Sequence, residues 1–163
     1  MAEPTVRFVA AVLTGGSSRR MGRDKATLPV EGIAMARRVA DAAAGAGAQR
    51  VVVIGHPVEG LDHLDDEHPG EGPLGGVVTA LRWADVDPVV VLACDLLRPS
   101  APAVAHAVEV LAGVPSAAVA VPVVDGRAQW LHSAWRPPEA LEPLAAAFAE
   151  GERSLHRAVS AVA

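Results

Sequence analysis

The chain has 163 residues, a hydrophobic fraction of 51% and a formal net charge of −5. This length fits one domain, and the apolar content is enough for a buried core, which argues against a disordered chain. The acidic balance and the lack of a long basic run argue against non-specific nucleic-acid binding, because a basic face would supply most of the affinity.

Other features of the sequence argue against a disulfide-bonded, secreted or membrane-spanning protein. The single cysteine, Cys94, leaves no intrachain disulfide and makes a cysteine-based metal site implausible. The N-terminal residues lack the basic segment and apolar stretch of about 7–15 residues that mark a signal peptide. No uninterrupted apolar run reaches about 18 residues, the length of a membrane span. We therefore expect a cytoplasmic protein with no membrane partner.

The elements predicted along the chain alternate between strands and helices. Short apolar runs predict strands buried on both faces, and helical spacing of apolar residues predicts amphipathic helices. In chain order, we predict a strand at Arg7–Leu13, a loop at Thr14–Lys25, a turn at Pro29–Gly32, a helix at Ile33–Ala46, a strand at Arg50–Ile54, a long polar loop at Gly55–Gly72, a helix at Pro73–Ala84, a strand at Pro88–Cys94, a helix at Ala101–Ala112, strands at Ala117–Val124 and Gln129–Trp135, and helices at Pro138–Ala149 and Ser154–Val162.

This alternation predicts an α/β fold with a mostly parallel sheet, because strands joined through helices form βαβ units. The Asp125-Gly126 turn predicts one antiparallel hairpin at an edge of the sheet. Neither an internal repeat nor an interdomain linker interrupts the pattern, so we predict a single domain over residues 1–163.

The loop after the first strand concentrates residues that bind anions. Gly15 and Gly16 let the backbone adopt positive φ and approach a ligand closely, so successive N–H groups can form an anion nest. Arg19, Arg20 and Lys25 add positive charge. The pattern matches neither the Walker loop nor the dinucleotide fingerprint. It predicts a loop for a nucleotide polyphosphate, and the alternative is a glycine-rich turn with solvated arginines.

Two further segments also carry residues that suit a nucleotide or its metal ion. Asp95 ends a buried strand, where a carboxylate can hold Mg²⁺ together with substrate phosphates; the alternative is a helix N-cap. Gly75 and Gly76 lie just inside a predicted helix, where glycine is unfavourable unless something packs against the backbone. A base or ribose edge would explain them, and a flexible turn is the alternative.

Other polar and aromatic residues have structural interpretations. We expect His132 to be partly buried and hydrogen-bonded rather than a substrate contact. The long loop carries His56, His63 and His68, which we expect to be spread apart rather than to form a metal cluster. The three tryptophans are expected to pack in the core or at its edge, and Cys94 to be a small buried residue.

The motifs together resemble the MobA-like nucleotidyltransferases, and within them the molybdenum cofactor guanylyltransferases. The family's opening pattern, Leu-x-Gly-Gly-x-Ser-x-Arg-Met-Gly-x-Asp-Lys, is matched by residues 13–25. An acidic residue before Gly-Pro-Leu-x-Gly is matched by Asp66 and residues 72–76, and a Cys-Asp strand end by residues 94–95. Weaker similarity continues through residues 125–132 and the Gly-Glu-Arg-Ser-Leu segment at 151–155.

The resemblance implies a Rossmann-like three-layer α/β/α fold, Mg²⁺ as cofactor, and transfer of GMP from GTP to the phosphate of molybdenum-bound molybdopterin with release of pyrophosphate. Molybdenum insertion enzymes or acceptor enzymes are implied partners. The implied nucleotide contacts are the backbone of Leu13, Thr14, Gly15 and Gly16, the Lys25 side chain, Asp66 near the guanine or ribose, and Asp95 on the metal. Asp65 remains an alternative to Asp66.

The implied chemistry needs no general base. A phosphate monoester has a second pKa of about 6, so the nucleophile is largely dianionic at neutral pH. Positive charge must offset the repulsion between two anions, and the implied catalytic residues are Arg19, Arg20, Lys25 and Asp95.

The sequence also departs from the family. Ile54 occupies a position where guanylyltransferases often have asparagine, Leu96-Leu97-Arg98-Pro99 replaces the usual segment after Cys-Asp, and Trp130 replaces a proline. An Asn-Thr-Pro-Glu-Asp-Leu-like tail has no match, so we expect a domain without that tail. These departures leave two alternatives open: a related cytidylyl- or sugar-phosphate nucleotidyltransferase, and a non-catalytic nucleotide-binding homologue.

Overall fold

The computed structural model describes residues 6–15, 29–30 and 33–162. Its centre is a six-stranded sheet with the order β5-β4-β1-β6-β10-β7. The strands are β1 (Val9–Leu13), β4 (Val51–Ile54), β5 (Asp62–Leu64), β6 (Val89–Ala93), β7 (Val119–Ala120) and β10 (His132–Trp135). β5, β4, β1 and β6 run parallel, whereas β10 is antiparallel to both β6 and β7. The predicted α/β class and mostly parallel sheet are confirmed.

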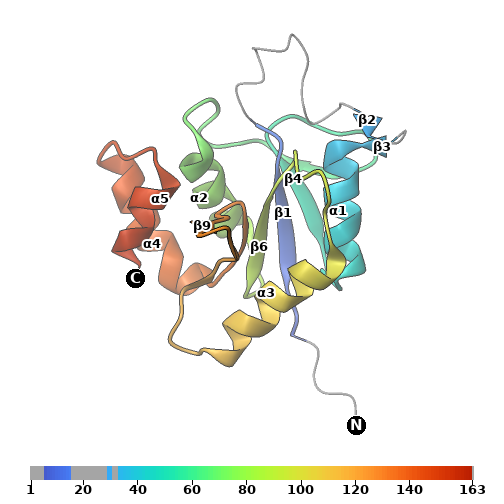
Figure 1. Ribbon diagram of the computed structural model, residues 1–163. Helices are drawn as coiled ribbons and strands as arrows, with labels where there is room; N and C mark the ends of the chain where they lie inside the picture. Colours follow the sequence, from blue (N-terminus) through green and yellow to red (C-terminus); the bar gives the residue numbers. More distant parts are fainter. Residues whose placement is uncertain (1–5, 16–28, 31–32, 163) are drawn as a thin grey trace.

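The helices cover both faces of the sheet, which confirms the three-layer arrangement (Figure 1). Their bounds are α1 (Met35–Gly45), α2 (Pro73–Trp83), α3 (Ala101–Gly113), α4 (Pro137–Ala149) and α5 (Leu155–Ala158), followed by the 3₁₀ helix η3 (Val159–Ala161). Alternate residues of β1 enter two separate cores. Val9, Ala11 and Leu13 pack with α2, α4 and α5, and Ala10 and Val12 pack with α1 and α3.

The carboxyl ends of the parallel strands meet at one edge of the sheet. Leu13, the last residue of β1, pairs with Ile54 on one side and Ala93 on the other, and each of these ends its own strand. This edge is uppermost in Figure 1. The connections that follow these strands therefore begin side by side, at the edge where ligand sites of open α/β sheets lie.

Two predicted strands are wrong in their extent. The segment 117–124 divides into β7 and β8 (Val123–Val124), and the segment 129–135 contributes only β10 to the main sheet. β8 pairs with β9 (Arg127–Ala128) in a separate two-stranded sheet. Asp125 and Gly126 form the predicted turn with φ values of 49° and 76°. The antiparallel edge of the main sheet is instead β10 with β7, which pair across a longer connection.

Three smaller predictions also need correction. Ile33–Ala34 is the strand β3, paired with β2 (Pro29–Val30), so helix α1 begins at Met35. The predicted loop 55–72 contains β5, which adds to the sheet beside β4. The last predicted helix is a single turn, α5, continued by η3. Among the described residues, no helix combines the length and apolar character that a membrane crossing demands.

Candidate nucleotide-binding site

Thr14 anchors the loop that follows β1. Its backbone N–H donates to the Ile54 carbonyl at 2.8 Å, and its hydroxyl lies 3.0 Å from the same oxygen and 2.7 Å from the His56 carbonyl. The residue is only 3% exposed. The Thr14 N–H is thus already hydrogen-bonded within the protein. The nucleotide contact that the resemblance implies for the Thr14 backbone would therefore be made by its carbonyl oxygen. Leu13 is buried, and its side chain packs toward helix α2.

Gly15 and Gly55 bring the ends of β1 and β4 into direct backbone contact. Gly55 has φ +112°, and a Cβ atom there would lie 2.5 Å from the Gly15 nitrogen and 2.8 Å from its Cα. Real Cβ atoms do not approach so closely, so only glycine fits this position. Sequence reasoning did not single out Gly55. The available signal was a glycine directly after a buried strand.

Asp66 lies against the same loop. Its Oδ1 accepts a hydrogen bond from the His68 backbone N–H at 2.9 Å and lies 3.2 Å from the Thr79 hydroxyl. Its Oδ2 faces Gly15, because a Cβ added to Gly15 would lie 3.6 Å from that oxygen. The Asp65 side chain is 97% exposed and lies beside His63. The geometry therefore favours Asp66 over Asp65 for the predicted nucleotide contact.

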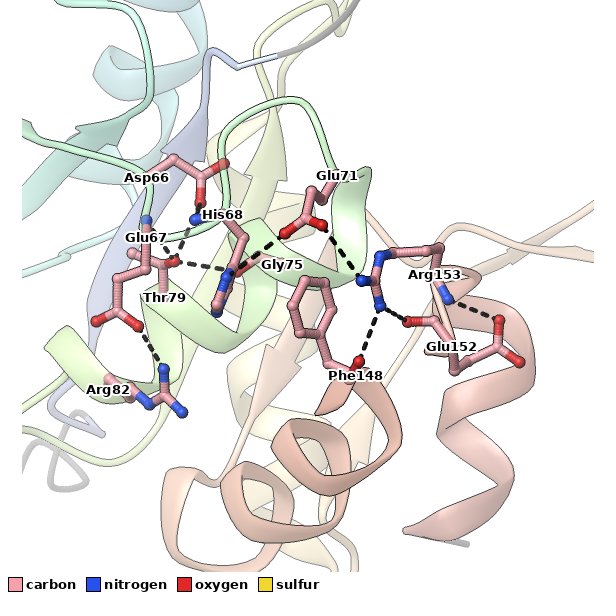
Figure 2. Close-up of polar contacts among 10 residues, drawn as sticks. All are labelled: Asp66, Glu67, His68, Glu71, Gly75, Thr79, Arg82, Phe148, Glu152 and Arg153. Atoms are coloured by element: carbon pink, nitrogen blue, oxygen red, sulfur yellow. Dashed lines mark hydrogen bonds and ion pairs between the residues drawn. The ribbon is translucent and has the colours of Figure 1, made fainter. Parts of the chain in front are cut away.

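Thr79 connects the segment around Asp66 to helix α2 (Figure 2). Its hydroxyl accepts a hydrogen bond from the Glu67 backbone N–H at 3.2 Å and lies 3.0 Å from the Gly75 carbonyl. Glu67 also forms an ion pair with Arg82, one turn further along α2. Thr79 was missed from the sequence, although a buried threonine on an otherwise apolar helix face was a usable signal.

The two glycines at the start of α2 have a different cause from the one expected. A Cβ on Gly76 would lie 3.0 Å from a methyl carbon of Leu13, and a Cβ on Gly75 would lie 2.8 Å from the His68 Cβ. Side chains of the protein therefore supply the close packing for which a base or ribose edge was expected. The prediction that α2 opens with a proline is confirmed: Pro73 is its first residue and follows Gly72, which has φ +90°.

Asp95 follows β6 at the same edge of the sheet. The preceding residue, Cys94, donates its backbone N–H to the Leu13 carbonyl at 3.3 Å, so this segment adjoins the end of β1. Asp95 is exposed. Within the described ranges, its carboxylate has no hydrogen bond or ion pair, so both oxygens are available to a hard cation. An exposed carboxylate without a protein partner is a donor that fits Mg²⁺, which takes one or two carboxylates and completes its ligands from water and phosphates.

The other predicted site residues lie outside the described residues, so their roles stay predictions: Gly16, Arg19, Arg20 and Lys25. In the part of the chain that the structure describes, no three histidine, cysteine, aspartate or glutamate side chains gather as metal ligands.

The aromatic residues and the cysteine lie largely as expected, and His132 does not. Trp135 is fully buried, and its Nε1–H donates to the Ser133 hydroxyl at 2.6 Å. Cys94 is half-buried against the α1–α3 core. His132 is partly buried, but its Nδ1 atom has no hydrogen-bond partner among the described residues, which corrects the expectation of a hydrogen-bonded histidine.

Glu152, in the connection from α4 to α5, carries a perturbed carboxyl group. Hydrogen bonds from the Arg157 side chain and from the Ser154 backbone N–H lower its pKa from 4.5 to about 2. Because the pKa is lower in the folded state, this stabilisation is complete above pH 4.5 and is lost as the pH falls through about 2. The interaction therefore holds the α4–α5 connection at neutral pH.

We expect the Glu152 carboxyl to titrate with a midpoint near pH 2 in the folded protein. The substitution Arg157→Met removes the largest cause and should raise this midpoint toward 4.5. Side-chain carboxyl chemical shifts, followed by NMR against pH in both proteins, measure the two values. A wild-type midpoint at the ordinary glutamate value would contradict the prediction.

The fold defines an α/β protein with a mostly parallel sheet, and the edge described above carries Gly15 after β1 and carboxylates after β5 and β6. The family model of the MobA-like NTP transferase domain matches residues 10–162. The chain therefore belongs to the MobA-like NTP transferase family, as the motifs predicted.

Curated relatives are named molybdenum cofactor guanylyltransferases. A probable one from Opitutus terrae is 43% identical over 82 residues, which are 47% of this chain and 41% of the relative. One from Xanthomonas euvesicatoria is 40% identical over 90 residues, covering 55% of this chain and 47% of the relative. The chain thus spans less than half the length of these two. A probable one from Bacillus cereus is 30% identical over 167 residues, covering 94% and 80%.

Solved structures share the fold. Molybdopterin-guanine dinucleotide biosynthesis protein A from Archaeoglobus fulgidus has a TM-score of 0.73 at 22% identity, covering 93% of this chain and 78% of that one. A 2-C-methyl-D-erythritol 4-phosphate cytidylyltransferase from Thermus thermophilus has a TM-score of 0.72 at 19% identity, covering 94% and 83%.

Proposed function

We propose that this protein transfers GMP from GTP to the phosphate of molybdenum-bound molybdopterin and releases pyrophosphate. The observation that carries the proposal is the convergence of Gly15, Asp66 and Asp95 at one edge of the parallel sheet. Curated relatives that share the family are named for the guanylyltransferase activity, and this supports guanine as the base and molybdenum cofactor as the acceptor.

Asp95 would hold Mg²⁺ at this edge, because its carboxylate is exposed and directly follows β6 beside the end of β1, the strand that leads into the Gly15 loop. When bound, the cation neutralises phosphate charge and polarises the α-phosphorus toward attack. A single carboxylate is sufficient, since Mg²⁺ in such sites retains waters and takes its other ligands from the substrate phosphates.

The residues of the chain would orient the nucleotide and offset its charge. Asp66, with Oδ2 directed at the Gly15 loop, can accept hydrogen bonds from the guanine or ribose. The backbone around Gly15 and Gly16 and the charges of Arg19, Arg20 and Lys25 would bind the triphosphate. The acceptor phosphate is already ionised at neutral pH, so no side chain must remove a proton from it.

The test is pyrophosphate release by the purified protein with Mg²⁺, molybdenum-loaded molybdopterin and one nucleotide at a time. We expect turnover with GTP and at least about 100-fold lower kcat/KM with CTP or ATP, because a site that hydrogen-bonds one base leaves buried polar groups unpaired with another. Mass spectrometry of the pterin product should show one added GMP.

Two outcomes would contradict different parts of this assignment. Equal use of CTP would remove guanine as the base. Binding of GTP without any turnover on loaded molybdopterin would favour the non-catalytic homologue. An acceptor screen with sugar phosphates in place of the pterin tests the remaining alternative from the sequence.

A further inference from the structure

The Gly-Glu-Arg-Ser-Leu segment at residues 151–155 has no role in the function proposed above, yet one of its residues reaches the candidate site. Arg153 lies between α4 and α5, far along the chain from Asp66. Figure 2 shows its guanidinium directed toward the segment 66–72, which we call the Asp66 segment. That segment joins β5 to α2 and carries the carboxylate that faces Gly15.

The Arg153 guanidinium joins two parts of the structure. One nitrogen, Nη1, donates to the carbonyl of Phe148, in the last turn of α4, at 2.8 Å and to that of Glu152, in the connection to α5, at 2.9 Å. The other, Nη2, donates to Glu71 Oε1 at 3.2 Å. Glu71 is 82 residues away in sequence. An exposed ion pair alone contributes little, but here the same planar group also donates to two backbone carbonyls, one of them in the last turn of α4, so its orientation is constrained.

Phe148 extends this contact to the residue beside Asp66. The Arg153 guanidinium lies 4.0 Å from the centre of the Phe148 ring, and the ring centre lies 4.2 Å from that of His68. The His68 backbone N–H in turn donates to Asp66 Oδ1. His68 also packs tightly on Gly75 at the start of α2. The Asp66 segment is therefore held on one side by α2 and on the other by Phe148 and Arg153.

We propose that Arg153 is a positioning residue for Asp66: it holds the Asp66 segment through Glu71 and the Phe148–His68 contact, so that Oδ2 of Asp66 faces the nucleotide loop. The part of this inference that is tested through the KM for GTP rests on the proposed function. Because Asp66 would contact the guanine or ribose, which do not change during phosphoryl transfer, loss of its position weakens binding equally in the ground and transition states. The expected effect therefore falls on KM rather than on kcat.

The experiment compares Arg153→Met and Arg153→Lys with Arg50→Met as the matched control. Arg50 makes the same two kinds of contact, an ion pair with Asp85 and a cation–π contact with the Trp83 ring. It lies just before β4, at the opposite edge of the sheet from the Asp66 segment. We expect Arg153→Met to raise the KM for GTP about tenfold with kcat within about twofold, as loss of one charged hydrogen bond predicts. Arg153→Lys should recover part of this loss, and Arg50→Met should change KM by less than about twofold.

A double substitution tests whether Arg153 acts through Asp66. If it does, Asp66→Asn combined with Arg153→Met should have a KM no higher than Asp66→Asn alone, because the interaction has already been removed. Additive effects would overturn the proposal, as would an unchanged KM in Arg153→Met. Should Arg153→Met not fold, Glu71→Gln removes the same ion pair from the other side and should raise KM in the same direction.

Amide hydrogen exchange without nucleotide separates this inference from the proposed function. The His68 and Glu71 amides donate hydrogen bonds within the Asp66 segment. We expect them to exchange about tenfold faster in Arg153→Met than in Arg50→Met. If the wild-type protein does not bind GTP, the proposed function fails, and this exchange still decides whether Arg153 holds the segment. Equal exchange in the two variants would overturn the inference even if GTP turnover is confirmed.

Discussion

Replacement of Asp95 by asparagine should lower kcat/KM for GTP by about 1,000-fold while the protein remains folded. The amide keeps the size of the side chain but loses the negative charge that would hold Mg²⁺ against the substrate phosphates. A loss of this order matches the removal of one electrostatic group from a phosphoryl- or acyl-transfer site. Pyrophosphate release, measured over a range of Mg²⁺ concentrations, should show both lower turnover and a higher Mg²⁺ requirement.

The control for this prediction is Asp41→Asn. Asp41 is an exposed carboxylate on α1. The same loss of charge there should leave turnover within about twofold, because exposed surface substitutions have small effects. Thermal unfolding should show Asp95→Asn within about 3 °C of wild type, since its side chain has no partner among the described residues. Wild-type turnover by Asp95→Asn would remove Asp95 from the metal site.

Replacement of Gly55 by alanine should have the largest effect on stability that the described backbone predicts. The new Cβ would lie 2.5 Å from the Gly15 nitrogen, so β4 and the start of the nucleotide loop must move apart. The residue also has φ +112°, which an L-side chain rarely adopts. We expect the free energy of unfolding to fall by about 3–5 kcal/mol, and GTP affinity to fall with the displaced loop.

Gly47→Ala separates the two causes. Gly47 follows α1 with φ +100°, and nothing lies within 4 Å of the Cβ position. It therefore reports the backbone conformation alone, about 1–2 kcal/mol, and the change in the unfolded chain is the same at both sites. Urea denaturation of both variants gives the difference. If Gly55→Ala and Gly47→Ala destabilise equally, the close approach of β4 to Gly15 has no energetic consequence.

Much of the architecture was predictable because short-range sequence patterns determine it. The valine-rich run 89–93 is apolar on both faces and could only be a strand between two helical layers. Gly72 and Pro73 marked the start of α2, and Asp125-Gly126 marked a tight turn, because both depend on backbone conformations that few residues adopt. The family followed from motifs within single segments.

The partners of short strands were not predictable in the same way. β5 has only three residues and no apolar alternation, and it exists because its backbone pairs with β4. The division of residues 117–124 between two sheets has the same origin. Backbone pairing between distant segments leaves no periodic mark on either segment, so the sequence pattern alone could not locate these strands.

The sequence by itself determined that this protein has an α/β fold, a glycine loop after the first strand and membership of the nucleotidyltransferase family. The tertiary structure decided which residues meet. It brings Asp66 rather than Asp65 to the loop, sets Gly55 against Gly15, and joins Arg153 to Glu71. The physical reason is that periodicity and turn chemistry act over a few residues, whereas these contacts join groups up to 82 positions apart, which only packing across the sheet brings together.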